Sequence, residues 1–337
     1  MTLKSHGIFA GNPIGGSRCH RIFAGILLFG LMEVSLPGQA AAPATGSSYG
    51  YPDISGYKPD LVPPVMTRKT PGAGRRVRAT LPKYRDTDVH YSLYLPTDWR
   101  PGGQYPVIVE YSGNGGREGA GVYRSPYGDI STGLVSDSSL GYGLSGGAGA
   151  IWIVLPFIDA GQARNTVWWW GDVEATVAFC KEAVKTVCAE FGGDPEAVLL
   201  CGFSRGAIAC NYIGLHDDEI AGLWRAFFPA SHYDGAWPNP YPGNDRAAAL
   251  RRLQRLGGRP VFASHEVVNL RETTFSIMYT INYLAQSGLP LDNFKFQIVP
   301  VRNHTDRWVL YDFVARKNLR RWWQEVLGGP SAPTAEQ

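Results

Sequence analysis

The pattern with the most chemical content is a serine set between two glycines. Residues 202–206 read Gly-Phe-Ser-Arg-Gly, with Ser204 at the centre. The apolar run 197–201 precedes this pattern, and a helix-like run beginning at Ala207 follows it. A serine at such a strand-to-helix turn is exposed on a strained backbone, and the flanking glycines let strand and helix approach closely. The context therefore favours a nucleophilic Ser204 over a serine that only caps a helix.

Apolar runs of strand-like and helix-like length alternate along most of the chain. The expected strands cover residues 76–81, 89–95, 105–111, 150–156, 197–203, 224–229, 260–264 and 294–301. The expected helices cover residues 173–190, 205–215, 245–256, 273–286 and 311–326. Several strands are continuously apolar, as expected when helices cover both faces of a sheet. The sequence predicts an α/β fold with a mostly parallel central sheet of about eight strands, opened by two antiparallel strands.

The first 42 residues have the layout of a secretory signal peptide. Basic residues precede an apolar run over 22–32, and small residues follow it at 39–42. The apolar run has eleven residues, whereas a membrane-spanning helix needs about 20. We therefore expect a secreted or periplasmic protein with no stable membrane insertion after signal removal; the alternative is an uncleaved anchor.

The rest of the chain divides by composition. Residues 43–75 are rich in Pro, Gly, Ser and Thr and predict a linker or a surface arm. Residues 76–328 carry the alternating pattern of one catalytic domain, and residues 329–337 are expected to form a disordered tail. The segment 113–149 is long and rich in Gly, Ser and Tyr. A loop of that length is usually functional, so we expect it to border the site.

Composition and charge limit the possible partners. Hydrophobic residues make up 44% of the 337 positions and charged residues 18%, which excludes a disordered chain. The formal net charge is +3, with no basic run, so the electrostatic footprint of a nucleic-acid partner is missing.

The cysteines and acidic runs give no metal signature. Loss of the leader leaves Cys180, Cys188, Cys201 and Cys210, which either form disulfides in an exported protein or act as small buried hydrophobes. Cys180 and Cys188 share one expected helix and are too far apart along it to bridge. No cysteine has zinc-site spacing, and the run of one histidine and three acidic residues at 216–219 is interpreted as a helix end. We predict no metal and no cofactor.

The strand order, the turn at Ser204 and a late histidine resemble the α/β-hydrolase superfamily over roughly residues 76–328. The runs Tyr-Ser-Leu-Tyr-Leu-Pro at 91–96 and Tyr-Pro-Val-Ile-Val at 105–109 resemble secreted esterases of the feruloyl esterase and polyhydroxybutyrate depolymerase type. The resemblance implies an α/β-hydrolase fold with helices on both sheet faces. It also implies a serine hydrolase.

A serine nucleophile needs a histidine that takes its proton and later returns it. His304 follows the last expected strand and precedes the last helix, where the superfamily places its base, and we expect it to have that role. His232 and His265 also follow strands and stay as alternatives. His90 and His216 are interpreted as surface or capping residues.

The third catalytic group is a carboxylate that orients the imidazole and stabilises its cation. The superfamily normally places it after the seventh strand, where this chain has Asn269, which cannot serve as an anion. Glu266, at the end of the same strand, is the first choice. Asp234, after the sixth strand, is the second. Asp306 is interpreted as a helix cap or a supporting group.

Two further parts of the site are implied. The oxyanion of an acyl-transfer reaction needs backbone donors, which the resemblance places at Arg205 and in the loop after the third strand, at Gly113 or Asn114. Trp169 and Trp170, in a run of three tryptophans at 168–170, are candidates to stack on a sugar or phenolic ring. Packing in the core is the alternative for them.

The sequence as a whole predicts a secreted serine hydrolase that cleaves carboxylic esters through an acyl-enzyme. Its substrate would be a small-molecule ester or a polysaccharide or polyester ester. One alternative is a peptidase or amidase similar to the prolyl oligopeptidases, which share the serine motif. Another is a non-catalytic binding protein with this fold, which the Asn269 departure favours.

Overall fold

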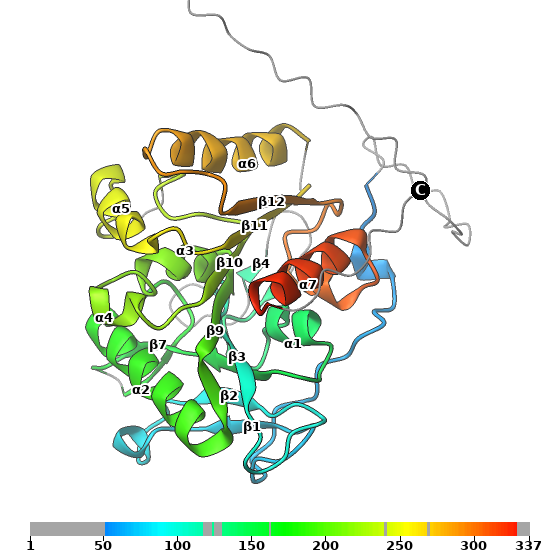
Figure 1. The fold of residues 1–337 in the computed structure, drawn as a ribbon, viewed down its shortest axis with the longest axis vertical. Helices are drawn as coiled ribbons and strands as arrows, with labels where there is room; N and C mark the ends of the chain where they lie inside the picture. Colours follow the sequence, from blue (N-terminus) through cyan, green and yellow to red (C-terminus); the bar gives the residue numbers. More distant parts are fainter. Residues whose placement is uncertain are drawn as a thin grey trace, which may run out of the picture. The chain divides into compact units, whose positions relative to one another are not determined.

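One eight-stranded sheet organises the structure (Figure 1). Its strands are β1 (Arg76–Ala79), β2 (Tyr91–Tyr94), β3 (Tyr105–Tyr111), β6 (Ile151–Leu155), β9 (Gly193–Phe203), β10 (Ala226–Ala230), β11 (Val261–Glu266) and β12 (Phe294–Val299). They lie in the order β1-β2-β6-β3-β9-β10-β11-β12. β2 pairs antiparallel with β1 and β6, and all other neighbours pair in parallel. The predicted sheet with its antiparallel opening is confirmed, and the arrangement is the α/β-hydrolase fold.

The computed structural model describes residues 51–116, 123–124, 130–161, 163–238, 241–267 and 270–328, with the backbone alone at 123–124, 130 and 270–276. All of them belong to one compact unit, Ser47–Gln337. The predicted signal peptide, the predicted tail and Asn269 lie outside the described residues.

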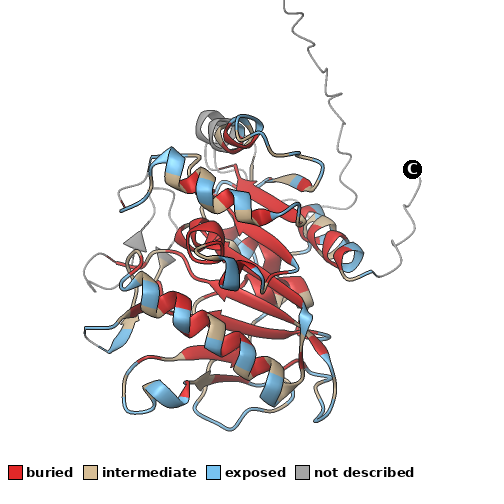
Figure 2. Ribbon diagram, turned by 60° about the vertical axis from the view of Figure 1, so that its left-hand side comes forward, coloured by how far each residue is buried: buried red, intermediate tan, exposed pale blue. Residues whose placement is uncertain are grey.

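Helices cover both faces of the sheet. They are α1 (Leu140–Ser145), α2 (Val173–Phe191), α3 (Arg205–Tyr212), α4 (Asp218–Ala221), α5 (Arg246–Leu253), α6 (Leu270–Ala285) and α7 (Val314–Val326), with 3₁₀ turns η1 (Ile54–Gly56), η2 (Pro82–Tyr84), η4 (Gln254–Leu256) and η5 (Asp306–Leu310). α2 to α6 contribute to the core on one face, and α1 and α7 to the core on the other. Figure 2 shows the strands buried between helices whose outer sides are exposed. The continuously apolar strands follow from this double cover.

The long segment 113–149 contains a helix that the sequence pattern did not predict. α1 has only six residues, two of them glycine, so no apolar periodicity marks it. Its N-terminus is capped from the sheet: the buried Glu110 carboxylate accepts hydrogen bonds from the backbone N–H of Leu140 (3.1 Å) and Gly141 (2.9 Å) and from Nε1 of Trp152 (2.8 Å). A carboxylate at a helix N-terminus satisfies free N–H groups and complements the helix dipole.

Residues 51–75, predicted as a linker or arm, run along the surface of the sheet domain. Asp53 pairs with Arg302 at 2.5 Å, and the side chain of Ile54 is buried. Asp60 accepts two hydrogen bonds from Arg316 of α7, at 2.7 and 2.9 Å. This arm is therefore attached to the segment that follows β12 and to the last helix.

The four cysteines in the described part of the chain, Cys180, Cys188, Cys201 and Cys210, are all free. Burial raises the pKa of Cys180 to about 12 and that of Cys201 well above its usual range. Cys180, Cys201 and Cys210 therefore act as buried hydrophobes, one of the two interpretations open from the sequence, and Cys188 is half-buried. Among the described helices, none combines the length and the apolar character needed to cross a bilayer.

The turn between β9 and α3 depends on two close backbone approaches. A Cβ atom added to Gly206 would lie 1.9 Å from the carbonyl oxygen of Tyr111 in β3. One added to Gly202 would lie 2.2 Å from the carbonyl oxygen of Gly206. Only glycine lets the first turn of α3 rest against the ends of the two central strands.

The close approach of Gly206 to Tyr111 predicts the effect of adding one methyl group at residue 206. We expect Gly206→Ala to reduce the free energy of unfolding by at least about 2 kcal/mol, because backbone atoms must move to admit the side chain. Gly56→Ala is the matched control, since an added Cβ there meets nothing within 4 Å. Thermal unfolding of both variants is the measurement. Equal melting temperatures for Gly206→Ala and the unsubstituted protein would contradict the packing argument.

Candidate active site

Ser204 lies on a strained turn between β9 and α3. Its backbone has φ 52° and ψ −113°, a region that residues other than glycine rarely adopt. Its N–H donates to the carbonyl of Ala230 at the end of β10 (3.0 Å), and its own carbonyl accepts from the N–H of Ala207 (3.0 Å) and Ile208 (3.2 Å). These bonds hold the strained residue between two strand ends and a helix start, as the sequence motif predicts for an exposed nucleophile.

His304 lies after β12 and packs beside the serine turn. Its ring centroid is 4.7 Å from that of Phe203, the residue before Ser204. Its Nδ1 is 3.0 Å from Oγ of Ser231 and 3.5 Å from Oε1 of Glu266. Nδ1 is thus engaged, and Nε2 is the nitrogen left to take a proton from Ser204. No hydrogen bond joins the two side chains within the described residues, and such bonds often tighten only with substrate bound.

Burial sets the charge of this histidine. Desolvation lowers the pKa of His304 well below its usual value, and the nearby His232 and His265 lower it further. The pKa values of His232 and His265 are also lowered by burial, that of His265 to about 4. His304 is therefore neutral at pH 7, which is the protonation state that a general base requires.

The structure brings Glu266, and not Asp234, to His304. Glu266 ends β11, is buried, and also accepts a hydrogen bond from the N–H of Thr305 (3.2 Å). The Asp234 carboxylate is bound by Arg252 of α5 at 2.8 Å and by the hydroxyl of Tyr241 at 2.7 Å. The two carboxylates that the sequence left open therefore have different partners, and the geometry disfavours Asp234 as the acid.

Of the other histidines considered, His265 donates from Nδ1 to the backbone carbonyl of Glu266 (2.9 Å). His90 and His216 contact Asp88 and Glu174 instead. Asp306 begins η5 and accepts a hydrogen bond from the N–H of Ser139 (2.8 Å). This contact agrees with the interpretation of Asp306 as a supporting group.

The loop after β3 lies against the serine turn. A Cβ added to Gly113 would lie 3.1 Å from the ring of Phe203. Within the described residues, neither the N–H of Gly113 nor that of Arg205, the first residue of α3, has an acceptor. The Oδ1 of Asn114 accepts from the N–H of Trp169 (2.9 Å) and fixes the loop. Two free N–H groups beside Ser204 form the arrangement that an oxyanion needs.

The Arg205 side chain ties this loop to the tryptophan run. It is buried over the ring of Phe157 at 4.1 Å and donates to the carbonyl of Trp169 (2.7 Å) and to that of Ser112 (3.4 Å). Desolvation lowers the pKa of Arg205 to about 9, so it remains a cation at neutral pH.

The tryptophan run is mainly a packing element. Trp170 is buried and stacks on Tyr212 with centroids 4.6 Å apart. It therefore presents no free face to a ligand, contrary to the expectation of a substrate-stacking residue, because the aromatic cluster of α3 and its neighbours encloses it. Trp169 is half-buried, has φ 47°, and lies 5.5 Å from the ring of Tyr241.

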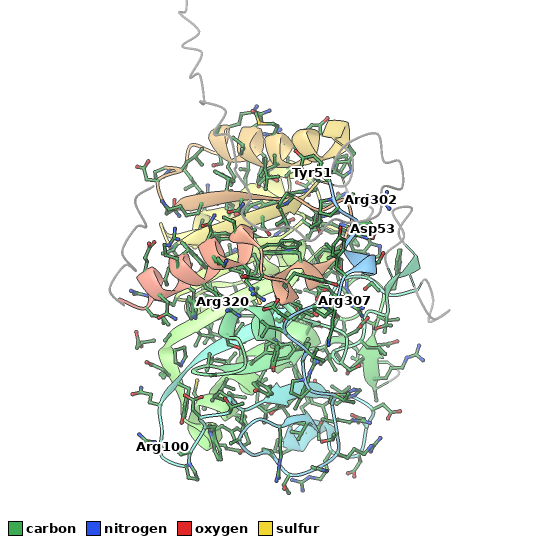
Figure 3. All side chains as sticks on the ribbon, turned by 90° about the vertical axis from the view of Figure 1, so that its right-hand side faces the viewer. Tyr51, Asp53, Arg100, Arg302, Arg307 and Arg320 are labelled. Carbon is green, nitrogen blue, oxygen red and sulfur yellow. The ribbon has the colours of Figure 1, made fainter. Side chains whose placement is uncertain are left out.

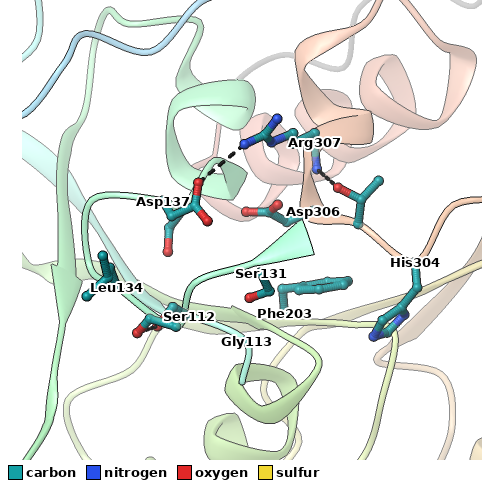
Figure 4. Close-up of a pocket in the computed structure, with 12 residues that line it drawn as sticks. Ser112, Gly113, Ser131, Leu134, Asp137, Phe203, His304, Asp306 and Arg307 are labelled. Atoms are coloured by element: carbon teal, nitrogen blue, oxygen red, sulfur yellow. Dashed lines mark hydrogen bonds and ion pairs between the residues drawn. The ribbon is translucent and has the colours of Figure 1, made fainter. Parts of the chain in front are cut away.

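Figure 4 shows a small pocket beside the serine turn, with His304 and the loop at Ser112 and Gly113 on either side of Phe203, the residue before Ser204. Asp137, Ser138, Thr305 and Arg307 line its other side. Within the described part of the chain, no group of three or more His, Cys, Asp or Glu side chains is arranged to hold a metal ion.

Sequence reasoning missed Ser231. Its hydroxyl lies 3.0 Å from Nδ1 of His304 and 3.0 Å from Nδ1 of His232, and its backbone has φ 86°. The only available signal was its position at the end of an expected strand, next to a histidine already weighed as a base. A positive φ at serine has no sequence signature.

No protein-family model and no curated protein sequence matches this chain. Among solved structures, a thermostable esterase is similar at 11% identity and a TM-score of 0.45, over 74% of this chain and 62% of that one. The apo AtxE2 isopeptidase is similar at 15% identity and a TM-score of 0.49, over 77% of this chain and 41% of that one.

A variant of the feruloyl esterase module from Clostridium thermocellum, complexed with sinapinate, is similar at 15% identity and a TM-score of 0.45, over 78% and 93% of the two chains. This chain spans less than two thirds of the thermostable esterase and less than half of the isopeptidase. Because one fold supports many reactions, the reaction must be argued from the residues themselves.

Proposed function

We propose that this protein is a serine hydrolase that cleaves carboxylic esters through an acyl-enzyme. One observation carries the proposal. A serine on a strained turn, a buried neutral histidine held at Nδ1, and a buried carboxylate 3.5 Å from that nitrogen lie beside a loop with a free N–H. Each of these features has a separate role in acyl transfer, and a serine that only capped α3 would need none of them.

The reaction runs in two halves. Ser204 Oγ attacks the ester carbonyl while its proton passes to Nε2 of His304. The tetrahedral oxyanion accepts hydrogen bonds from the N–H of Arg205 and of Gly113. Collapse breaks the bond to the alcohol oxygen, which takes the proton from His304 and leaves. Water then attacks the acyl-enzyme with His304 as base, and the acid and free Ser204 are released.

The charge of Glu266 is needed when His304 is a cation. Burial opposes an imidazolium, and a carboxylate beside Nδ1 offsets that cost in the transition state. The buried Arg205 cation adds positive potential near the oxyanion, since no carboxylate partner neutralises it within the described residues.

An ester is the less demanding substrate for this arrangement, because an alkoxide leaves more readily than an amide nitrogen. The alternative function, that of a peptidase or amidase, predicts that peptide amides are cleaved as well. A panel of short aryl esters, sugar esters and peptide amides therefore distinguishes the two. Cleavage of amides at rates comparable to esters would favour the alternative function.

The nucleophile is tested by Ser204→Ala. We expect the turnover of an aryl ester such as p-nitrophenyl butyrate to fall at least about 1,000-fold, because the attacking oxygen is lost. Covalent labelling by a serine-directed phosphonate should be lost with it. Ser287→Ala removes a hydroxyl in the turn after α6 and should change neither readout. Retention of activity within about tenfold in Ser204→Ala would refute the assignment.

The acid is tested by Glu266→Gln with Asp234→Asn as the matched control. Glu266→Gln keeps the shape but removes the charge beside His304, and we expect kcat to fall by about 1,000-fold or more. Asp234→Asn should keep kcat within about threefold in the folded protein. It should lower stability by about 3 kcal/mol or more, because it leaves the Arg252 guanidinium without its buried partner.

Circular dichroism and thermal unfolding establish that each variant is folded before rates are compared. A collapse of kcat in Asp234→Asn with near-full activity in Glu266→Gln would reverse the assignment of the acid.

A further inference from the structure

A cavity of about 850 Å³ lies beside the small pocket at His304. Its walls come from the arm at residues 54–66, from residues 136–139 before α1, and from Leu310 and Tyr311 at the end of η5. Figure 3 shows the arm and Arg307 on the same side of the molecule. The volume lies within the range typical of small-molecule sites, about 300–1,000 Å³.

The cavity adjoins the pocket that contains His304. Asp137, Ser138, Thr305 and Arg307 line both the cavity and the pocket that contains His304. Asp137 and Arg307 form an ion pair of 3.3 Å at this junction, and the Arg307 side chain is 59% exposed. A partly exposed ion pair of this kind contributes little stability, about 0–1 kcal/mol, so a bound ligand can separate Asp137 from Arg307.

The lining favours an uncharged, largely apolar group. Most of the arm residues that face the cavity are Ile, Leu, Val, Met or Pro. The charges at the junction neutralise each other, and the buried Arg76 guanidinium already donates to Ser92 (2.8 Å) and to the carbonyl of Val135 (2.9 Å). The Ser138 hydroxyl is buried without a hydrogen-bond partner in the described part of the chain.

We propose that this cavity binds an extended apolar arm of the ester substrate, an aliphatic or aryl group well beyond a short acyl chain. One polar atom on that arm would reach Ser138. This inference rests on the proposed function, since it places the scissile carbonyl at Ser204 and the arm past Asp137 and Arg307. The arm belongs either to the acyl group or to the alcohol, and both have the same chemistry in the cavity.

The test is a pair of substrate series. One series varies the acyl chain, from p-nitrophenyl acetate to decanoate; the other varies the alcohol, from ethyl to decyl acetate. Each methylene that enters an apolar site contributes up to about fourfold, so kcat/KM should rise at least about tenfold between the two- and eight-carbon members of one series. The series that rises identifies the part of the substrate in the cavity.

Two variants fill the cavity. Leu61→Trp and Val62→Trp should flatten the rising series to within about threefold and leave p-nitrophenyl acetate hydrolysis within twofold. Val62 is 68% exposed, so Val62→Trp should fold and still test the proposal if Leu61→Trp does not fold. Val314→Trp, at an exposed position of α7 outside the cavity lining, is the control and should leave the series unchanged.

Two failures can be told apart. Flat series with acetate hydrolysis that depends on Ser204 would overturn the cavity proposal and leave the esterase proposal intact. No Ser204-dependent hydrolysis of any ester would overturn both. An unchanged slope in folded Val62→Trp and Leu61→Trp would also overturn the cavity proposal.

A second inference follows from Ser231, independently of the cavity. Its hydroxyl lies between two imidazole nitrogens, at 3.0 Å from each. When Nε2 of His304 is the base, Nδ1–H of His304 donates to Ser231 Oγ; Oγ then either donates to Nδ1 of His232 or accepts from the N–H at that position. Glu266 is farther from Nδ1 of His304, at 3.5 Å.

The geometry points to Ser231 as a positioning residue that fixes the tautomer and orientation of His304, with His232 as a second imidazole in contact with the same hydroxyl. Glu266 then acts on His304 chiefly through its charge. The strained φ of 86° at Ser231 is consistent with this role, because strain is retained where surrounding contacts require one side-chain direction.

Ser231→Ala and Ser231→Gly test this role together. Both remove the hydroxyl, but glycine also relieves the backbone strain. We expect both to lower kcat about tenfold or more with KM within twofold. Loss of the oxygen that accepts from Nδ1 destabilises the imidazolium, so the acid limb of kcat/KM should move to lower pH. The titratable groups facing His304 are Glu266 and His265 of β11 and His232 after β10.

A purely structural role makes a different prediction. If Ser231→Gly recovers the kcat that Ser231→Ala loses, the effect lies in the backbone and the proposal is wrong. It is equally wrong if kcat in Ser231→Ala stays within twofold of the unsubstituted protein, or if the acid limb does not move.

Discussion

The rest of the site depends on one close approach, that of the Gly206 backbone to the carbonyl oxygen of Tyr111. It sets the start of α3 against the ends of β3 and β9, directly after the positive φ of Ser204. The same contact aligns the loop after β3 with the first N–H groups of α3. The proposed nucleophile and the proposed oxyanion donors therefore lie on segments that this close approach holds together.

A buried carboxylate supports the opposite side of the pocket. Glu110 lies on the α1 face of β3, where its carboxylate caps that helix and binds Trp152. Burial raises the pKa of Glu110, and the hydrogen bonds from Gly141, Leu140 and Trp152 and the charge of Arg76 oppose that shift without cancelling it. Because residues 136–139 lead directly into α1, the wall shared by the pocket and the cavity is positioned by a residue that touches neither.

The sequence predicted the strands, the serine turn and His304 because each has a local signature: apolar runs, glycine spacing, or position after the last strand. It could not choose between Glu266 and Asp234, since both follow strands and only tertiary packing pairs Asp234 with Arg252. The sequence could not show whether Trp170 packs in the core or contacts a ligand, because a run of tryptophans does not reveal which ring faces other side chains cover. Ser231 and α1 were missed for the same reason, as both are defined by contacts distant in the chain.

The free cysteines have a practical consequence for handling the protein. No disulfide links any part of the described chain, and the fold is held by a core buried on both faces of its sheet. Folding of this domain should therefore not require an oxidising environment. With their thiolate forms disfavoured by burial, Cys180, Cys201 and Cys210 should resist alkylation in the native state. The reactivity of these three thiols, as distinct from that of the half-buried Cys188, would then report on opening of the domain.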